Sequence, residues 1–488
     1  MSIKIYNTLN RKKEEFKPLQ GEGKGLGIYV CGPTVYDDPH IGHARSAYVF
    51  DVIRRYLEYR GHKVTFVRNV TDVDDKIINK AKEEFKDEDI KIAVERVSKK
   101  YLDIYHKCMD DLGIMPPDEE PKATEYIDKM KGFIGILIQR GVAYESDGDV
   151  YFEVRKAEDY GKLSNQSLEM LESGARISPG ENKKDPLDFA LWKSAKEGEV
   201  SWPSPWGPGR PGWHIECSVM SSEILGDEFD IHGGGIDLIF PHHENELAQS
   251  EGAEKGFARY WIHNGLLTIN KEKMAKSLGN FVTVDEVLGK YSPDVLKILF
   301  LGTHYSHPVD FSWDAMASEK ESLGRIINFL ERIEKREKRE DDYSPGGAVF
   351  KKNPLERFKE ELKEAYMGFE KAMDDDFNTS NAVAGIFDIV RYGNTVLGWS
   401  KYNNKEHIKY FKKAREVILK LGKVLGLEFK QKEKQLPISR EEIEKKIDLR
   451  KDARKNKDFK MADKIRKDLD KIGIMLEDEK DRTSWRVK

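Results

Sequence analysis

The chain of 488 residues contains only three cysteines, Cys31, Cys108 and Cys217. Three scattered thiols in a chain of this length cannot form a disulfide framework, so a reducing compartment is expected. The N-terminus lacks the apolar core of a signal peptide, and the sequence has no run of ~18 apolar residues that would suggest a membrane span. These absences exclude a secreted disulfide scaffold and predict a cytoplasmic protein with no membrane partner.

The sequence also lacks an excess of charge of either sign. Its 83 Lys and Arg residues are balanced by 87 Asp and Glu residues, giving a net charge of −4. A global attraction to a polyanion is therefore excluded, and any nucleic-acid contact must use local basic faces. The length predicts three or four domains, at roughly 100–200 residues per domain.

A strand–helix–strand pattern is present near the N-terminus. The apolar stretch Ile28–Val30 precedes a helix-period run over 44–59, and a second apolar stretch follows at Val64–Val67. Such a βαβ unit is parallel and almost always right-handed. The loop over 32–43 should therefore lie at the carboxyl end of a parallel sheet, where open α/β folds bind ligands.

The pattern is interrupted and then resumes. An irregular middle region is followed by strand-like runs at Phe229–His232 and Tyr260–Ile269, and the sequence past about Ser318 is almost wholly helical. The predicted fold class is α/β: a Rossmann-like parallel-sheet catalytic domain split by an insertion, then an all-α helical bundle and a small C-terminal domain. The predicted limits are 1–125 and 229–317 for the two catalytic halves, 126–228 for the insertion, 318–430 for the bundle and 438–488 for the last domain.

His40-Ile41-Gly42-His43 lies between the first predicted strand and helix. Gly42 allows a nucleotide to approach closely, and the two histidines can donate hydrogen bonds to phosphate oxygens as charge builds on them. The pattern taken alone is equally compatible with two solvated histidines in a helix-capping loop.

Lys273-Met274-Ala275-Lys276-Ser277 follows the last strand-like run. Two lysines in a loop of small residues suit an electrostatic clamp on departing pyrophosphate, although a solvated basic turn explains them equally well in isolation. HIGH followed about 230 residues later by a KMSKS-like loop is the paired signature of class I aminoacyl-tRNA synthetases. Ala275 departs from the usual serine, with little expected consequence because both flanking lysines are present.

Pro241 precedes the sequence His242-His243-Glu244-Asn245-Glu246. His242 and Glu246 are four residues apart and project from one helical face at a spacing suited to a shared metal; His243 with Glu246 is nearly as suitable. A solvated helix start accounts for this pair at least as well. The chain has no CxxC pair, so local spacing does not establish a zinc site.

Motifs in a fixed order carry a more specific resemblance: YVCGPTVYD with HIGHAR, NVTDVDDKI, GWHIECS, FDIHGGGIDLIFPHHENELAQ and KMAKSLGN. In this order they resemble the motifs of cysteinyl-tRNA synthetases. The resemblance implies one Zn²⁺ held by Cys31, Cys217, His242 and Glu246. Zinc prefers sulfur to a neutral hydroxyl, so it would separate cysteine from serine, which a shape-selective pocket does only ~10–200-fold. With four protein ligands, the substrate thiolate must enter as a fifth ligand or displace one.

The same resemblance implies the remaining site residues and partners. Amino-acid binding is expected at Gly32, Thr34, Thr71, Trp213 and Asp237; catalysis at His40, His43, Lys273 and Lys276; and ATP binding at His40, Gly42, His43 and Lys276. Cysteine would be activated by ATP with Mg²⁺ and transferred to the terminal adenosine of tRNA(Cys), which the helical bundle and the C-terminal domain contact. A monomer is expected.

Three alternatives were weighed against this function. A cysteine ligase that acts on an amino sugar would lack the full C-terminal domains. A non-catalytic zinc-containing RNA-binding protein would have no reason to retain HIGH together with both loop lysines. A synthetase for another amino acid would not place two cysteines at the amino-acid pocket.

Overall fold

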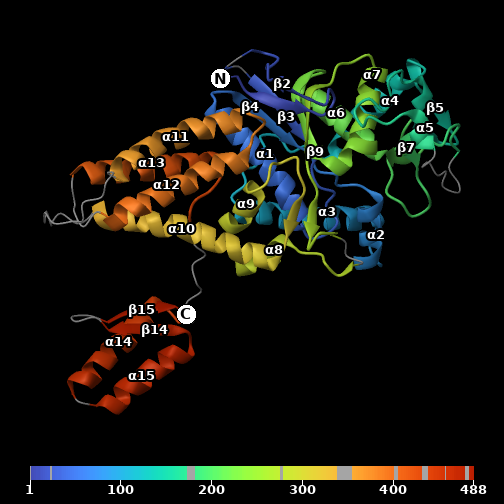
Figure 1. Cartoon of the computed structure of the whole chain (residues 1–488). Coiled ribbons are helices and arrows are strands. Elements are labelled where there is room, and N and C mark those ends of the chain that lie inside the picture. The colour runs from blue at the N-terminus through green and yellow to red at the C-terminus, as the bar shows by residue number, and fades with distance from the viewer. Residues whose placement is uncertain are drawn as a thin grey trace. The chain divides into compact units, whose positions relative to one another are not determined.

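The computed structural model describes residues 2–21, 23, 25–172, 182–274, 278–337, 354–399, 405–430, 438–456, 458–478 and 483–487. The chain divides into two compact units, Met1–Lys430 and Gln431–Lys488 (Figure 1). Within the described part of the chain, no helix has both the length and the apolar character that a membrane crossing requires.

A four-stranded parallel sheet forms the centre of the first unit (Figure 1). Its strand order is β10 (Ala258–Asn264), β9 (Phe229–Gly235), β3 (Gly25–Val30) and β4 (Lys63–Arg68). Val30 pairs with Arg68 on one side and Gly233 on the other, so the strands end at one common edge. This arrangement confirms the predicted α/β class and the parallel βαβ unit.

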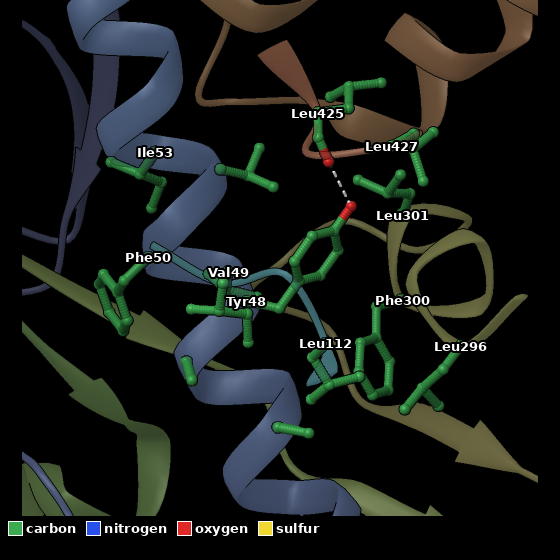
Figure 2. Packing of buried hydrophobic residues seen from close by; sticks show 14 of the residues in the cluster. Tyr48, Val49, Phe50, Ile53, Leu112, Leu296, Phe300, Leu301, Leu425 and Leu427 are labelled. Carbon is green, nitrogen blue, oxygen red and sulfur yellow. Dashed lines mark hydrogen bonds between the residues drawn. The ribbon is translucent and has the colours of Figure 1, made fainter. Parts of the chain in front are cut away.

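Helix α1 (Ile41–Tyr59) connects β3 to β4. Its buried face includes Tyr48, Phe50, Ile53 and Leu57, each at most 2 % exposed, and burying such side chains contributes about 1.5–3 kcal/mol apiece. Figure 2 shows Tyr48 reaching from α1 to the C-terminal part of the unit, where its hydroxyl donates to the Leu425 carbonyl at 2.6 Å. The helix therefore joins the sheet to a segment almost 380 residues later in the chain.

The segment between β4 and β9 contains a second core. Its antiparallel sheet, of order β5-β6-β7-β8, packs with the neighbouring helices around Ile134, Phe152, Trp192 and Ile215, whereas the two helices that follow β4 pack into the core around the central sheet. The elements are α2 (Asp75–Glu84), α3 (Ile90–Asp111), α4 (Ile127–Gln139), β5 (Ala143–Ser146), β6 (Asp149–Phe152), α5 (Leu168–Glu172), β7 (Phe189–Ser194), β8 (Gly209–Pro211) and α6 (Trp213–Leu225). The limits 126–228 for an insertion stay a prediction.

The strand-like run Tyr260–Ile269 is two strands rather than one. After β10 the chain breaks at Gly265, and β11 (Leu267–Ile269) enters a different sheet, between β12 (Glu272–Lys273) and β13 (Val309–Phe311). A Cβ at Gly265 would lie 2.5 Å from the His307 carbonyl oxygen. The close backbone approach that ends β10 therefore requires glycine.

A hairpin and a set of helices complete the first unit. The hairpin, of β1 (Lys4–Asn7) and β2 (Lys12–Glu15), precedes the sheet, and the helix α7 (Glu244–Gly252) follows β9. Helix α9 starts after Ser292 with Pro293 in its first turn, a position where the missing N–H costs nothing. The other helices are α8 (Val284–Lys290), α9 (Pro293–Leu301), α10 (Trp313–Glu337), α11 (Pro354–Asp374), α12 (Thr379–Trp399) and α13 (Lys405–Val424).

The second unit has a small core of its own. Helices α14 (Arg440–Lys455) and α15 (Phe459–Lys471) pack with the hairpin of β14 (Ile474–Asp478) and β15 (Thr483–Val487). A reciprocal capping box between Ser439 and Glu442 begins α14. Ile443, Leu469 and Ile474 are fully buried within this unit, which is consistent with independent folding.

We expect Leu469→Ala to destabilise the second unit alone. The substitution removes a fully buried side chain and should cost about 2–5 kcal/mol. Native-state hydrogen exchange of the whole chain should show faster exchange in α15 and β14, with the central sheet unchanged. Leu296→Ala, fully buried in α9, is the matched control with the opposite pattern. Equal acceleration in both units by either substitution would show that they unfold together.

Candidate active site

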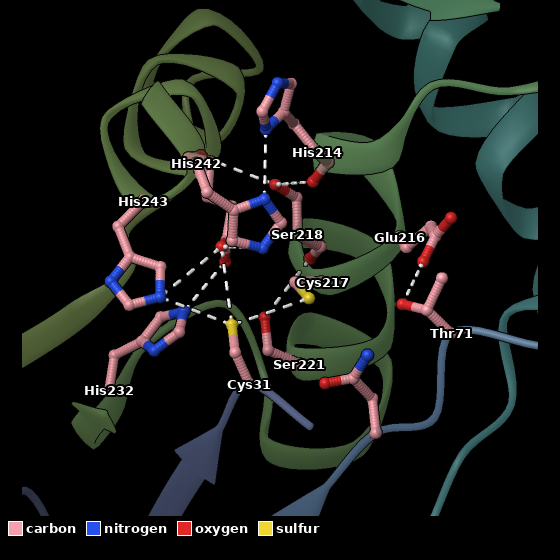
Figure 3. A network of polar contacts seen from close by, with 12 residues as sticks. Cys31, Thr71, His214, Glu216, Cys217, Ser218, Ser221, His232, His242 and His243 are labelled. Atoms are coloured by element: carbon pink, nitrogen blue, oxygen red, sulfur yellow. Dashed lines mark hydrogen bonds and ion pairs between the residues drawn. The ribbon is translucent and has the colours of Figure 1, made fainter. Parts of the chain in front are cut away.

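Four predicted metal ligands meet at the carboxyl end of the central sheet. Figure 3 labels three of them, Cys31, Cys217 and His242. Cys31 follows β3, Cys217 lies in α6, His242 lies in the turn before α7, and Glu246 lies in α7. One potential ligand atom from each residue lies within 4.8 Å of all the others. The Cys31 and Cys217 sulfurs are 3.7 Å apart, and His242 Nε2 is 3.0 Å from Glu246 Oε1.

Burial makes this cluster suited to a cation. Desolvation raises the pKa of both the Cys31 thiol and the Glu246 carboxyl well above their usual ranges and lowers the pKa of His242. Among the residues that the structure describes, the ion-pair partners of Glu246 are all histidines. A bound dication would favour the deprotonated thiol and carboxylate, and a set of two sulfurs, one imidazole and one carboxylate matches the ligands of zinc.

Further imidazoles surround these ligands. His232 Nε2 is 2.7 Å from Glu246 Oε2, and His243 Nε2 is 3.3 Å from the Cys31 sulfur. His243 Nδ1 is bonded to His263 Nε2 at 2.8 Å, and His214 Nδ1 lies 3.0 Å from His242 Nδ1. The site residues Cys31 and Glu246 therefore belong to a second possible ligand group, with His232 and His243.

Of these imidazoles, the sequence analysis predicts only His243 as a possible partner of Glu246 at a metal. The signal that was available for His232 is its position on a buried strand beside three glycines, where a histidine needs polar partners.

The predicted amino-acid pocket residues from β3 and β4 lie side by side. Thr34 and Thr71 form a parallel backbone bridge, and the Gly32 amide donates to the Asn69 side chain at 2.9 Å. The buried Thr71 hydroxyl donates to Glu216 Oε2 at 2.8 Å. Glu216, adjacent to Cys217, is a further polar group at this site that the sequence did not reveal.

Trp213 contacts the cluster, and Asp237 lies in an exposed turn of the chain. The Trp213 ring is stacked on the His242 ring with centroids 4.1 Å apart, although 39 % of the residue is exposed. Asp237 lies exposed in the turn after β9, three residues before Phe240 interrupts the helical geometry leading to α7. The Trp213 ring therefore packs directly against a metal-ligand candidate, whereas Asp237 lies in an exposed turn.

The two HIGH histidines form the cap of α1. His40 Nδ1 accepts hydrogen bonds from the amides of Gly42 and His43, and His43 Nδ1 accepts from the His40 amide. The two rings are stacked with centroids 3.7 Å apart. Burial lowers the pKa of His40 to about 4 and that of His43 to about 3, the latter also because His40 and Lys76 lie nearby.

These contacts determine the proton position on each ring. Both imidazoles are neutral at pH 7, and an Nδ1 that accepts hydrogen bonds carries no proton. The single ring proton of each is therefore on Nε2. Each histidine can donate one hydrogen bond from Nε2 to an oxygen without having to be charged.

The segment around the second motif lies against the first. Thr283 forms a backbone bridge with His40, and Phe281 contacts the His40 ring edge-to-face at 5.3 Å. A Cβ at Gly42 would lie 3.6 Å from the Met274 methyl group of the second motif. Lys273 is exposed in β12. Lys276, Ala275 and Ser277 lie outside the described residues.

Comparison with known proteins decides the family. A family model described as the class I (C) tRNA synthetase catalytic domain matches residues 16–321, a DALR domain matches 368–430, and a cysteinyl-tRNA ligase anticodon-binding domain matches 441–486. The chain belongs to the cysteine–tRNA ligase family. It is 46 % identical to the cysteine–tRNA ligase of Persephonella marina and 48 % identical to that of Sulfurihydrogenibium sp., with all of each chain covered. The chain is thus a class I aminoacyl-tRNA synthetase, as the sequence predicted.

Solved structures of other class I ligases share the fold. The Mycobacterium tuberculosis methionyl-tRNA synthetase bound to methionyl-adenylate matches with a TM-score of 0.62 at 15 % identity, covering 82 % of this chain and 90 % of that one. A putative arginyl-tRNA synthetase from Campylobacter jejuni matches with a TM-score of 0.57 at 15 % identity, covering 84 % and 95 %. This likeness confirms the Rossmann-like fold class of the ligase.

We expect the neutral HIGH histidines to make the free energy of unfolding decrease as the pH falls. Their folded pKa values lie below the ordinary value of about 6.5, so the unfolded chain binds more protons in acid. Their contribution is complete above pH 7 and is lost as the pH falls from 6.5 towards 4. Between pH 7.5 and 5.5, the melting temperature of His43→Asn should therefore fall less than that of the unsubstituted ligase. An equal loss in both proteins would contradict the neutral assignment of His43.

Proposed function

We propose that this chain activates L-cysteine with ATP and transfers the cysteinyl group to the 3′-terminal adenosine of tRNA(Cys). The observation that carries the proposal is the meeting of Cys31, Cys217, His242 and Glu246 after the strand that leads to the HIGH turn of α1. Two thiols in a possible metal site, together with the two HIGH histidines, suit a reaction whose substrates are a thiol amino acid and a phosphate chain. The relatives are named as ligases of this specificity over their whole length.

The metal centre is assigned to the four clustered side chains. Cys31, Cys217, His242 and Glu246 would hold Zn²⁺, which when bound supplies a soft Lewis acid that selects a thiolate over a hydroxyl. Gly32, Thr34 and Thr71 border this cluster from the ends of β3 and β4, and we assign them with Trp213 and Asp237 to the amino-acid substrate. Trp213 would form a wall, and the Asp237 carboxylate would accept from the substrate ammonium.

Activation requires positioning more than acid–base chemistry. A cysteine carboxylate oxygen attacks the α-phosphorus of ATP, and the bond to pyrophosphate breaks. His40 and His43 would donate from Nε2 to phosphate oxygens, while Lys273 and Lys276 would neutralise the departing pyrophosphate. Mg²⁺ would arrive with the nucleotide. The absence of a side chain at Gly42 would leave room for the nucleotide.

Transfer uses the same site. A ribose hydroxyl of the terminal adenosine, the 2′-hydroxyl by class I analogy, attacks the carbonyl carbon of the adenylate, and AMP leaves. We assign the helical bundle at 318–430 and the small domain at 438–488 to tRNA binding. The match of 441–486 to an anticodon-binding domain supports tRNA over an amino sugar as the acceptor.

The proposal predicts ATP–pyrophosphate exchange that depends on cysteine. Exchange should be absent with serine and should be lost on zinc chelation, because a hydroxyl is a poor ligand for the metal. No exchange with cysteine in zinc-loaded protein would refute activation and favour a non-catalytic RNA-binding protein. Charging of tRNA(Cys) but not of an amino sugar then identifies the acceptor.

The metal assignment predicts different outcomes for two buried cysteines. Cys217→Ala should lower zinc content and reduce cysteine-dependent exchange by about 100-fold or more, since a ligand is removed. Cys108→Ala is the matched control: Cys108 is buried in α3 outside the cluster, so zinc content should be unchanged. Cobalt substitution provides a readout independent of activity, because the thiolate-to-cobalt absorption should weaken only in Cys217→Ala. Full zinc content in Cys217→Ala would exclude this ligand.

A further inference from the structure

Arg45, two residues after the HIGH motif, is a buried cation whose partners are backbone carbonyls. It is 1 % exposed, and its guanidinium donates to the carbonyls of Gly265 at 2.6 Å and Leu266 at 2.5 Å. It also donates to the carbonyls of Tyr305 at 3.2 Å and His307. Among the described residues, no carboxylate forms an ion pair with it, and burial lowers its pKa from 12.5 to about 10, so it remains charged at pH 7.

These four carbonyls belong to two segments of the chain, and Arg45 binds both of them. Gly265 and Leu266 connect β10 to β11, which leads through β12 into the KMAKS loop (273–277). Tyr305 and His307 precede β13, the parallel partner of β11. The guanidinium thus fixes the chain where it leaves the central sheet and enters the sheet that bears Lys273. A planar group with five donors can bind four carbonyls at once, which an ammonium cannot do in the same geometry.

The far side of the KMAKS loop is attached to the same turn of α1. The Ile41 amide donates to the Val282 carbonyl at 3.2 Å, and the Val284 amide donates to the Pro39 carbonyl at 3.0 Å. The segment that carries the loop lysines is therefore held on both sides by the N-terminal end of α1 and the residues just before it. It is held before the loop through Arg45 and after the loop through the backbone beside His40.

The geometry points to Arg45 as a positioning residue that sets the KMAKS segment against the HIGH histidines. It touches neither metal-ligand candidate nor the predicted amino-acid pocket, so its effect falls on the nucleotide half of the site. This role rests on the proposed function, in which both motifs act on the phosphates of ATP. Loss of Arg45 should therefore impair the rate of adenylate formation rather than cysteine binding.

The test compares Arg45→Lys and Arg45→Ala with Arg54→Ala in the zinc-loaded full chain. Arg54 lies on the same helix, is 9 % exposed, and donates to the Pro116 carbonyl at 2.7 Å, far along α1 from the HIGH turn. Arg45→Lys should lower kcat of pyrophosphate exchange about 100-fold, because a misplacement of about 1 Å is worth that much. The KM for cysteine should stay within about threefold, since the amino-acid half is untouched.

Two further readouts separate positioning from loss of stability. Guanidinium ion at low millimolar concentration should restore activity to Arg45→Ala by filling the vacated position, and should have no effect on Arg54→Ala. Hydrogen exchange over residues 264–274 and 281–290 should accelerate in Arg45→Lys and remain unchanged in Arg54→Ala. If Arg45→Ala does not fold, the kcat and hydrogen exchange of Arg45→Lys test the role of Arg45.

An unchanged kcat in Arg45→Lys, or a cysteine KM that rises in step with the loss of kcat, would overturn the role. So would equal hydrogen exchange over these segments in Arg45→Lys and the unsubstituted protein. Absence of exchange activity in the unsubstituted protein would instead refute the proposed function. The hydrogen-exchange comparison would then still decide whether Arg45 couples the two segments.

Discussion

The close approach of the chain to the backbone of Asn69 as it leaves β3 is the constraint on which the site depends. A Cβ at Gly32 would lie 1.6 Å from the Asn69 carbonyl oxygen, so no other residue can occupy that position without moving the strand ends apart. This turn follows Cys31 directly and brings Thr34 alongside Thr71. Glycine at position 32 therefore permits the two strand ends to meet, and its role in substrate binding stays a prediction.

The buried groups at this turn lie close enough together to share a cation. Two thiols and a carboxylate that share one desolvated volume cost free energy when they are ionised. When they are protonated, they bind a metal weakly. Burial raises the pKa values of Cys31 and Glu246 and lowers those of His242 and His243, so a bound dication would offset the cost of ionising the first two groups. If Cys31, Cys217, His242 and Glu246 hold the metal, the bond from His232 to Glu246 would orient the carboxylate, as partners outside a ligand set commonly do.

The sequence predicted what depends on local pattern and family motif. The βαβ unit followed from apolar periodicity, and the four clustered ligand candidates followed from the order of the motifs. The split of Tyr260–Ile269 did not follow, because its cause is the His307 backbone against Gly265, more than 40 residues away in the chain. Arg45 and Glu216 were missed for the same reason: a buried charge inside a helical stripe resembles a surface residue until its tertiary partners are known. Lys276 lies outside the described residues, so its role stays a prediction.

Under the proposed function, the first turn of α1 would let a chain with no net basic charge bind phosphates. A helix start usually offers free amides to an anion, but here the donors are already used. The Ile41 amide donates to Val282, and the amides of Gly42 and His43 donate to His40 Nδ1. The capping that consumes these amides also leaves the proton of each HIGH imidazole on Nε2. The donors for a phosphate are therefore side chains, and their placement depends on how the KMAKS segment is held against this turn.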